Sequence, residues 1–186
     1  MTPQRTHPTI GACGIDCGLC PRYRTHGPSR CPGCCGPGFE AVHPSCVVVT
    51  CCVIKRGLPV CAECAEYPCA IFERPATTRD SFVTHRRMAP NQEAIRDGGL
   101  DAFVAAQAER LALLDAMLDG YNAGRSTSFY CLAAALLSID GLCAAIGAVP
   151  RDGDARTRAR RLGAELDVQA ALEQVDLALQ PGTAPA

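Results

Sequence analysis

The sequence predicts an α-rich protein in which a small, irregular, cysteine-rich module is followed by an all-helical bundle. Twelve of the 14 cysteines fall before residue 70, in a segment that is also dense in glycine and proline. Beyond that point apolar residues recur at three- and four-residue steps, which is typical of helices with one buried face. We therefore expect a module over 11–70, a bundle packed on it over 71–180, and flexible tails at 1–10 and 181–186.

The first module has little apolar surface to bury. Its one apolar run, the valines at 47–49, is enough for a short strand. A segment of this kind cannot offset its ordering entropy by burial alone and needs cross-links. Thiolate-bound metal supplies them, because the free energy of metal binding becomes free energy of folding.

The second half begins with short helices. Pro68 suits the first turn of a helix through CAIFER, and another helix is expected over SFVTHRRM, closed by Pro90. A third begins at about residue 91 and ends at Gly98 and Gly99, because glycine commonly follows the last turn of a helix.

Longer helices follow. The apolar stripe over 100–121 predicts one long helix, and FYCLAAALL, residues 129–137, predicts the next. Ser138 is a suitable N-cap for a further helix through LCAAIGA. After a polar break at 150–154, residues 155–180 predict one or two amphipathic helices.

The cysteine spacing indicates metal. Three CxxC pairs join Cys17 with Cys20, Cys31 with Cys34, and Cys61 with Cys64. Two intervening residues let both sulfurs face one ion at about 2.3 Å, and two such turns complete a tetrahedral zinc site. The N-terminus has no apolar run of a secretory signal or a membrane span, which predicts a cytoplasmic location. In such a reducing compartment clustered cysteines bind metal more often than they form disulfides.

These motifs resemble an uncharacterised cysteine-rich family of bacteria and archaea, a domain of unknown function described as zinc-binding. Its pattern starts with CGxxCxxCPxY, continues through CxGC, C-x4-C and a Lys-Gly or Arg-Gly element, and closes with CxECxxYPC. This chain carries CGIDCGLCPRY at 13–23, CPGC at 31–34, CVVVTC at 46–51, KRG at 55–57 and CAECAEYPC at 61–69. With YNAGRSTSFYCLAAALL at 121–137, the resemblance covers about residues 11–147.

The resemblance implies a set of metal ligands but supplies no activity. The implied ligands are Cys13, Cys17, Cys20, Cys31, Cys34, Cys46, Cys51, Cys61, Cys64 and Cys69. Cys35 and Cys52 are not part of the pattern, so the resemblance does not imply three sites of four cysteines each.

The identity of the metal stays open between two alternatives. Thiolates suit zinc, of which we expect two or three ions, and iron–sulfur clusters. In the second case a [4Fe-4S] cluster would have an open site at Cys13, Cys17 and Cys20, facing Tyr130 and Cys131 in a redox or metalloenzyme. The CxxxCxxC spacing is also typical of radical iron–sulfur enzymes, but in this chain no βα repeat follows the motif to build their barrel.

Several other side chains are weaker candidates. Cys131, near the start of an expected helix, is either an activated thiol, a further ligand or a small buried residue. His26 and His43 lie among the cysteines and suit a site of three cysteines and one histidine, whereas a solvated role fits His85 better. Asp16 is expected to orient the first cysteine loop through the backbone. We find no convincing catalytic constellation.

The charge of the chain indicates which kinds of partner it can bind. The net charge is -1, and residues 1–75 carry seven Lys and Arg against five Asp and Glu, a balance of +2. Each four-thiolate zinc site adds about -2, so a loaded module is neutral to acidic and we expect no nucleic-acid partner. The sequence therefore predicts a cytoplasmic metal-binding protein whose zinc sites stabilise a binding or scaffold module, with a protein as the remaining kind of partner.

Overall fold

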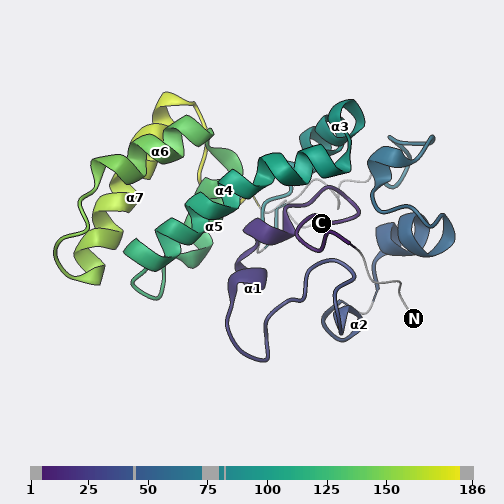
Figure 1. Ribbon diagram of the computed structural model, residues 1–186, viewed down its shortest axis with the longest axis horizontal. Coiled ribbons are helices and arrows are strands. Elements are labelled where there is room, and N and C mark those ends of the chain that lie inside the picture. Colours follow the sequence, from purple (N-terminus) through teal and green to yellow (C-terminus); the bar gives the residue numbers. More distant parts are fainter. Residues whose placement is uncertain (1–5, 44, 73–79, 82, 181–186) are drawn as a thin grey trace, which may run out of the picture.

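The computed structural model describes residues 6–43, 45–72, 80–81 and 83–180 (Figure 1). Helices dominate these residues and no strand occurs among them, which confirms the α-rich fold class. The elements are η1 (Cys17–Leu19), α1 (Pro21–Arg24), α2 (Phe39–Val42), the π-helix η2 (Val49–Lys55), η3 (Cys61–Glu63), α3 (Met88–Gly98), α4 (Leu100–Tyr121), α5 (Thr127–Leu136), α6 (Ile139–Ala148) and α7 (Ala155–Leu172).

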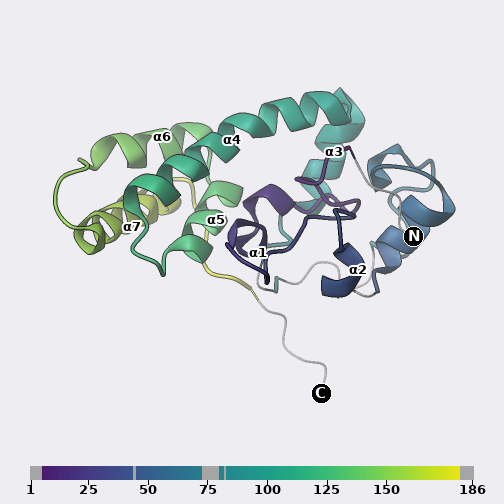
Figure 2. The same cartoon turned by 60° about the horizontal axis from the view of Figure 1, so that its bottom comes forward.

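The long helix α4 is the spine of the molecule. In Figures 1 and 2, α5, α6 and α7 lie around its C-terminal half, and α3 with the cysteine-rich region lies at its other end. Leu114 and Met117 are fully buried in the bundle core, where each such side chain contributes about 1.5–3 kcal/mol. The Tyr130 hydroxyl donates to the Tyr121 carbonyl at 3.1 Å, which ties α5 to the end of α4.

The helices expected from residue 91 onward are confirmed, and side-chain caps mark the starts of two of them. The helix expected over 100–121 is α4, and the Ser138 hydroxyl accepts from the Gly141 N–H at 2.9 Å at the start of α6. Asp154 caps α7 by accepting from the Thr157 N–H at 2.9 Å. Within 155–180 a single helix forms, and residues 173–180 continue without helical structure. In the described part of the chain no helix is long and apolar enough to cross a membrane.

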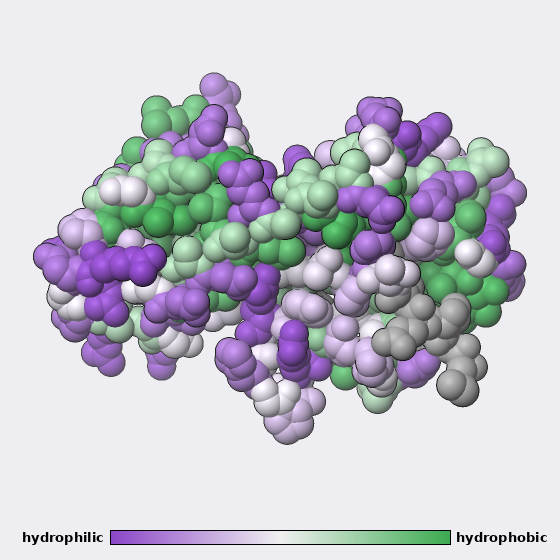
Figure 3. All heavy atoms as spheres, in the orientation of Figure 1, coloured by the Kyte–Doolittle hydropathy of each residue, from purple (hydrophilic) through white to green (hydrophobic). Residues whose placement is uncertain are grey.

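The strand expected at 47–49 is wrong. Val47 and Val48 begin a helical turn and Val49 is the first residue of η2. Val48 and Val49 are buried in the module core, while Val47 and Ile54 are about half exposed, at 48% and 54%. Figure 3 shows this apolar surface at the end of the module opposite the bundle. The valines therefore reach the core from one side of a helix.

The helix expected from Pro68 is absent from residues 68–72, and the rest of that segment, 73–79, lies outside the described residues. Pro68 follows a cis peptide bond, and the Phe72 N–H donates to the Cys69 carbonyl at 2.7 Å in a turn. The rings of Tyr67 and Phe72 pack edge to face with centroids 4.8 Å apart. The turn places both rings against the module core.

The helix expected over SFVTHRRM is also wrong for the described residues of that stretch. Residues 81 and 83–85 are irregular, and α3 begins only at Met88. Pro90 lies in the first turn of α3 instead of closing a helix before it. Its missing N–H costs nothing there, because first-turn N–H groups have no partner within the helix.

Both ends of the described chain are tied down. Ile10 is fully buried and the Thr9 carbonyl accepts from the Gly18 N–H at 2.8 Å, so order begins before the expected boundary at residue 11. At the other end the Arg86 guanidinium donates to the carbonyl of Asp176 at 2.7 Å. The expected tail at 181–186, like residues 1–5, lies outside the described residues.

Candidate metal centre

A first group of thiols comes from three separate segments of the module. Burial raises the pKa of Cys13 to about 12; the backbone N–H of Ile15 opposes the rise, and the thiols of Cys34 and Cys46 add to it. Burial likewise raises the pKa of Cys17, and Cys34 and Cys13 are the next largest causes. These four sulfurs are therefore electrostatic neighbours, although up to 33 residues separate them in sequence.

A second group lies between the module and the bundle. Burial raises the pKa of Cys20, the backbone N–H groups of Tyr23 and Arg22 oppose this, and Cys31 adds to it. On the bundle side, burial raises the pKa of Cys131 to about 12 with a further contribution from Cys20. The structure thus brings Cys131 to Cys20.

Cys131 does not have the surroundings of an activated nucleophile. It is 1% exposed within α5, and its raised pKa keeps the thiol protonated near neutral pH. Its neighbour Tyr130 is engaged by the Tyr121 carbonyl. Of the three readings of Cys131, these contacts favour the small buried residue and leave the further ligand open.

A third group lines a cavity of about 280 Å³ in the module that is partly open to the surface. The lining includes the thiol-bearing residues Cys51, Cys52, Cys61, Cys64 and Cys69, and with them Arg56, Glu66 and Tyr67. The contact with Cys52 and burial raise the pKa of Cys61, and Cys13 and Cys69 add to the rise. Arg56 and Glu66 form an exposed ion pair of 2.6 Å at the cavity.

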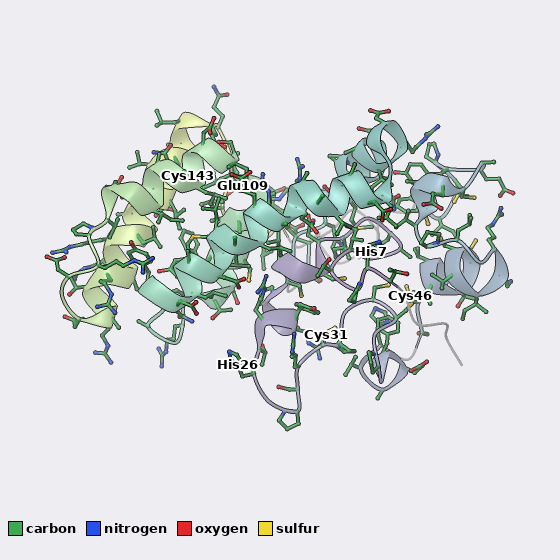
Figure 4. The ribbon with its side chains drawn as sticks, viewed as in Figure 1. His7, His26, Cys31, Cys46, Glu109 and Cys143 are labelled. Carbon is green, nitrogen blue, oxygen red and sulfur yellow. The ribbon has the colours of Figure 1, made fainter. Side chains whose placement is uncertain are left out.

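All ten implied ligands thus lie in these three groups. Two of the three CxxC pairs are divided between the first and second groups, whereas Cys61 and Cys64 both line the third. Cys31 interacts with Cys20, whereas Cys34 interacts with Cys13 and Cys17. All 14 cysteines lie within the described residues and none forms a disulfide. Figure 4 shows Cys46 in the module and Cys143 far from it on α6.

In the described residues, the thiols of each group are neighbours but do not surround one position for a metal ion. Across the described ranges, no three His, Cys, Asp or Glu side chains are placed to hold one metal ion. The donor chemistry fits a thiophilic metal, but a closed zinc site needs four sulfurs at about 2.3 Å from the ion. Four thiolates approach that closely only when a cation offsets their repulsion, so closure of a group has to accompany metal binding.

The two cysteines outside the family pattern are both buried. Cys35 has a left-handed backbone with a φ of 61°, and its sulfur lies 3.9 Å from that of Cys34. The Cys52 thiol donates to the Leu58 carbonyl at 3.4 Å. Cys52 is therefore engaged by the backbone, while its neighbour Cys51 lies beside Arg56.

The histidine candidates have surroundings of other kinds: His43 packs on an aromatic ring, His26 is exposed, and His85 is held by a backbone contact. The His43 ring stacks on Phe39 with centroids 5.3 Å apart, and His26 is exposed on the loop after α1 (Figure 4). His85 is partly buried, and its backbone N–H donates to the Asp80 carboxylate at 2.7 Å. These contacts give His43 and His85 packing and backbone roles.

Asp16 orients the first cysteine loop, as expected, but through its side chain. Its buried carboxylate accepts from the Asn91 amide at 2.9 Å and also from the Gln107 amide. Burial raises the pKa of Asp16 to about 6, and Asn91 and the charges of Arg87 and Arg110 oppose the rise. The loop that carries Cys13 and Cys17 is therefore anchored on both α3 and α4.

Two amides of α3 were missed at the sequence level. The Gln92 side chain is fully buried; its NH₂ donates to the Ala12 carbonyl at 3.0 Å, and its oxygen accepts from the Ala62 N–H at 2.6 Å. Asn91 donates to the Gly14 carbonyl at 2.8 Å. One glutamine thus joins the loop that leads into Cys13 to η3, which begins at Cys61. The only sequence signal was a pair of adjacent amides at a helix start.

No family model, curated protein or solved structure matches this chain. The likeness of CGIDCGLCPRY and CAECAEYPC to the zinc-binding family therefore remains a resemblance of motifs.

Proposed function

We propose that this is a cytoplasmic metal-binding protein in which thiolate-bound zinc stabilises the cysteine-rich module as a binding or scaffold unit. The observation that carries the proposal is the first thiol group. Cys34 and Cys46 come from separate segments and lie close enough to Cys13 to help raise its pKa, and Cys34 does the same to the pKa of Cys17. A tetrahedral zinc ion uses four such thiolates.

The energetics of the module support the same conclusion. Several of its core positions are taken by cysteines, such as Cys34, Cys52 and Cys61, beside a few valines. Buried thiols next to one another repel once deprotonated, and a divalent cation turns this repulsion into attraction. A closed site of four thiolates supplies folding free energy and no reaction chemistry, which suits a scaffold.

Metal analysis of native protein tests the proposal. We expect full-length protein, purified anaerobically with a reducing agent, to contain zinc, and Cys13→Ser to lose about one equivalent of it. Cys143→Ser is the matched control, because Cys143 is exposed on α6. Wild-type protein without zinc, or Cys13→Ser with the same zinc content as Cys143→Ser, would contradict the proposal.

A further inference from the structure

We infer that the cavity of the third thiol group holds a polynuclear metal–sulfide centre of the [4Fe-4S] type, bound by Cys51, Cys61, Cys64 and Cys69. This goes beyond the zinc proposed for the first group and places a different kind of metal centre on the neighbouring thiol group, which touches the first where Cys61 interacts with Cys13. If it holds, the zinc content falls to about one or two ions per chain.

The size of the cavity is the first argument. An ion bound by four thiolates lies about 2.3 Å from every sulfur and leaves no space between them. One water needs roughly 10–15 Å³ of cavity volume. The cavity measures about 280 Å³, so it has room for a group of many atoms.

The placement of the thiols is the second argument. Cys51 comes from η2, Cys61 from η3, and Cys64 and Cys69 from the turns that follow, so they line the cavity from different sides. A cubane cluster takes its ligands from several sides, because each thiolate binds a different iron at a different corner.

Cys52 lines the same cavity but has a different role. Its sulfur is turned toward the Leu58 carbonyl, 3.4 Å away, and the residue is only 2% exposed. With Cys52 engaged by the backbone, the other four cysteines of the lining match the number of ligands that a [4Fe-4S] cluster uses.

The remaining wall suits a charged cluster. A cluster with four thiolates is an anion, and Arg56 lies beside both Cys51 and Cys64. Val48, Ile71 and Phe72 supply apolar surface that limits water. Cys51, Cys64 and Cys69 are only partly buried, which leaves a route by which a preassembled cluster enters.

Cluster transfer tests the inference without a redox step. The probe is a synthetic [4Fe-4S] cluster with small-thiolate ligands, added anaerobically to the reduced full-length protein. Each protein thiol gives its proton to a departing small thiolate as its sulfur bonds to iron, so atoms and electrons balance. We expect about four iron and four acid-labile sulfides per chain, with charge-transfer absorption in the visible range.

Adjacent cysteines provide matched variants. We expect Cys51→Ala to retain at least about tenfold less cluster after gel filtration, because a ligand is lost, and Cys52→Ala to retain the wild-type amount. Equal retention in Cys51→Ala and wild type, or no iron retained by wild type, would overturn the inference. The Cys13→Ser variant separates the two proposals. If this variant loses zinc but takes up as much cluster as wild type, both proposals are supported. If it loses zinc and wild type takes up no cluster, only the zinc proposal is supported.

A footprint on the wild-type chain covers the case in which a variant does not fold. After transfer, the protein is alkylated anaerobically and each cysteine is read by mass spectrometry. We expect protection of Cys51, Cys61, Cys64 and Cys69 relative to protein without cluster, while Cys143 stays reactive. Unchanged alkylation of those four cysteines would overturn the inference.

Discussion

The bundle and the cysteine-rich module are held together by different forces. The bundle core consists of apolar side chains such as Leu114, Leu142 and Leu166, each fully buried. In the module core, thiols such as Cys35 and Cys52 take positions that leucine and methionine hold in the bundle. We therefore expect burial to stabilise the bundle, and we expect bonds between loops through a shared metal to contribute more in the module.

The junction between the two regions shows how one supports the other. Gln92 and Asn91 on α3 and Gln107 on α4 reach into the module and hold its loops through hydrogen bonds. Buried amide groups of this kind are costly when they lose a partner. The helical region therefore positions the thiol-bearing loops but does not bring their sulfurs onto one ion.

Loss of one zinc ligand is expected to have the largest effect on the module. Cys17→Ser removes a thiolate from the first group, and structural zinc contributes about 10–16 kcal/mol in small zinc-binding peptides. We expect limited proteolysis to cleave the variant within 11–72 while α4 to α7 stay intact. Cys143→Ser is the control, and a module as resistant in Cys17→Ser as in this control would refute the assignment.

The reverse effect is expected from a change in the bundle core. Leu114→Ala leaves a cavity at a fully buried position of α4, which costs about 2–5 kcal/mol of unfolding free energy. Denaturant unfolding followed by circular dichroism measures this loss, and zinc content should stay at the wild-type level. A drop in zinc content in the folded variant would show that the two regions are not stabilised separately.

A change at the junction is expected to affect the module without removing a thiol. Gln92→Leu leaves the Ala12 carbonyl and the Ala62 N–H without their buried partner, at about 1–3 kcal/mol for each group. We expect faster hydrogen exchange in η3 and in the loop that leads into Cys13, and weaker zinc binding. Glu93→Ala, at the exposed next position, should behave as wild type, and identical zinc affinity in both variants would contradict this role.

The smallest effect is expected at Asp80, which joins the segment before α3 to Gln180 near the end of the described chain. Burial by itself would raise the pKa of Asp80, but the N–H groups of Gln180 and His85 and the Thr84 hydroxyl lower it. Because the pKa is lower in the folded state, Asp80 stabilises the fold above its unfolded pKa of about 3.9, and this contribution disappears as pH falls through the folded value.

Urea unfolding at two pH values checks that contribution. Asp80→Asn should be less stable than wild type at about pH 6, and the difference should shrink below about pH 3. Asp167→Asn, on the exposed face of α7, is the control and should show no such difference. A stability gap between wild type and Asp80→Asn that does not change with pH would contradict a carboxylate role.

The bundle could be predicted from sequence because its signals are local. The period of apolar residues located α4, and Ser138 marked the start of α6 by its own side chain. The module was harder, since the valines at 47–49 joined a helix and residues 68–72 a turn, both governed by contacts with distant loops. The cysteines were identified by spacing, but spacing did not show that Cys34 neighbours Cys13 and Cys17 while Cys31 neighbours Cys20.

Hydrogen exchange of the full-length protein before and after chelation tests the difference between the two regions most directly. Peptides are followed by mass spectrometry under reducing, anaerobic conditions, with metal content measured in the same samples. We predict that metal removal abolishes protection within residues 11–72 and leaves the protection of α4 to α7 unchanged. Protection in the module that persists after all metal has been removed would contradict its stabilisation by thiolate-bound metal.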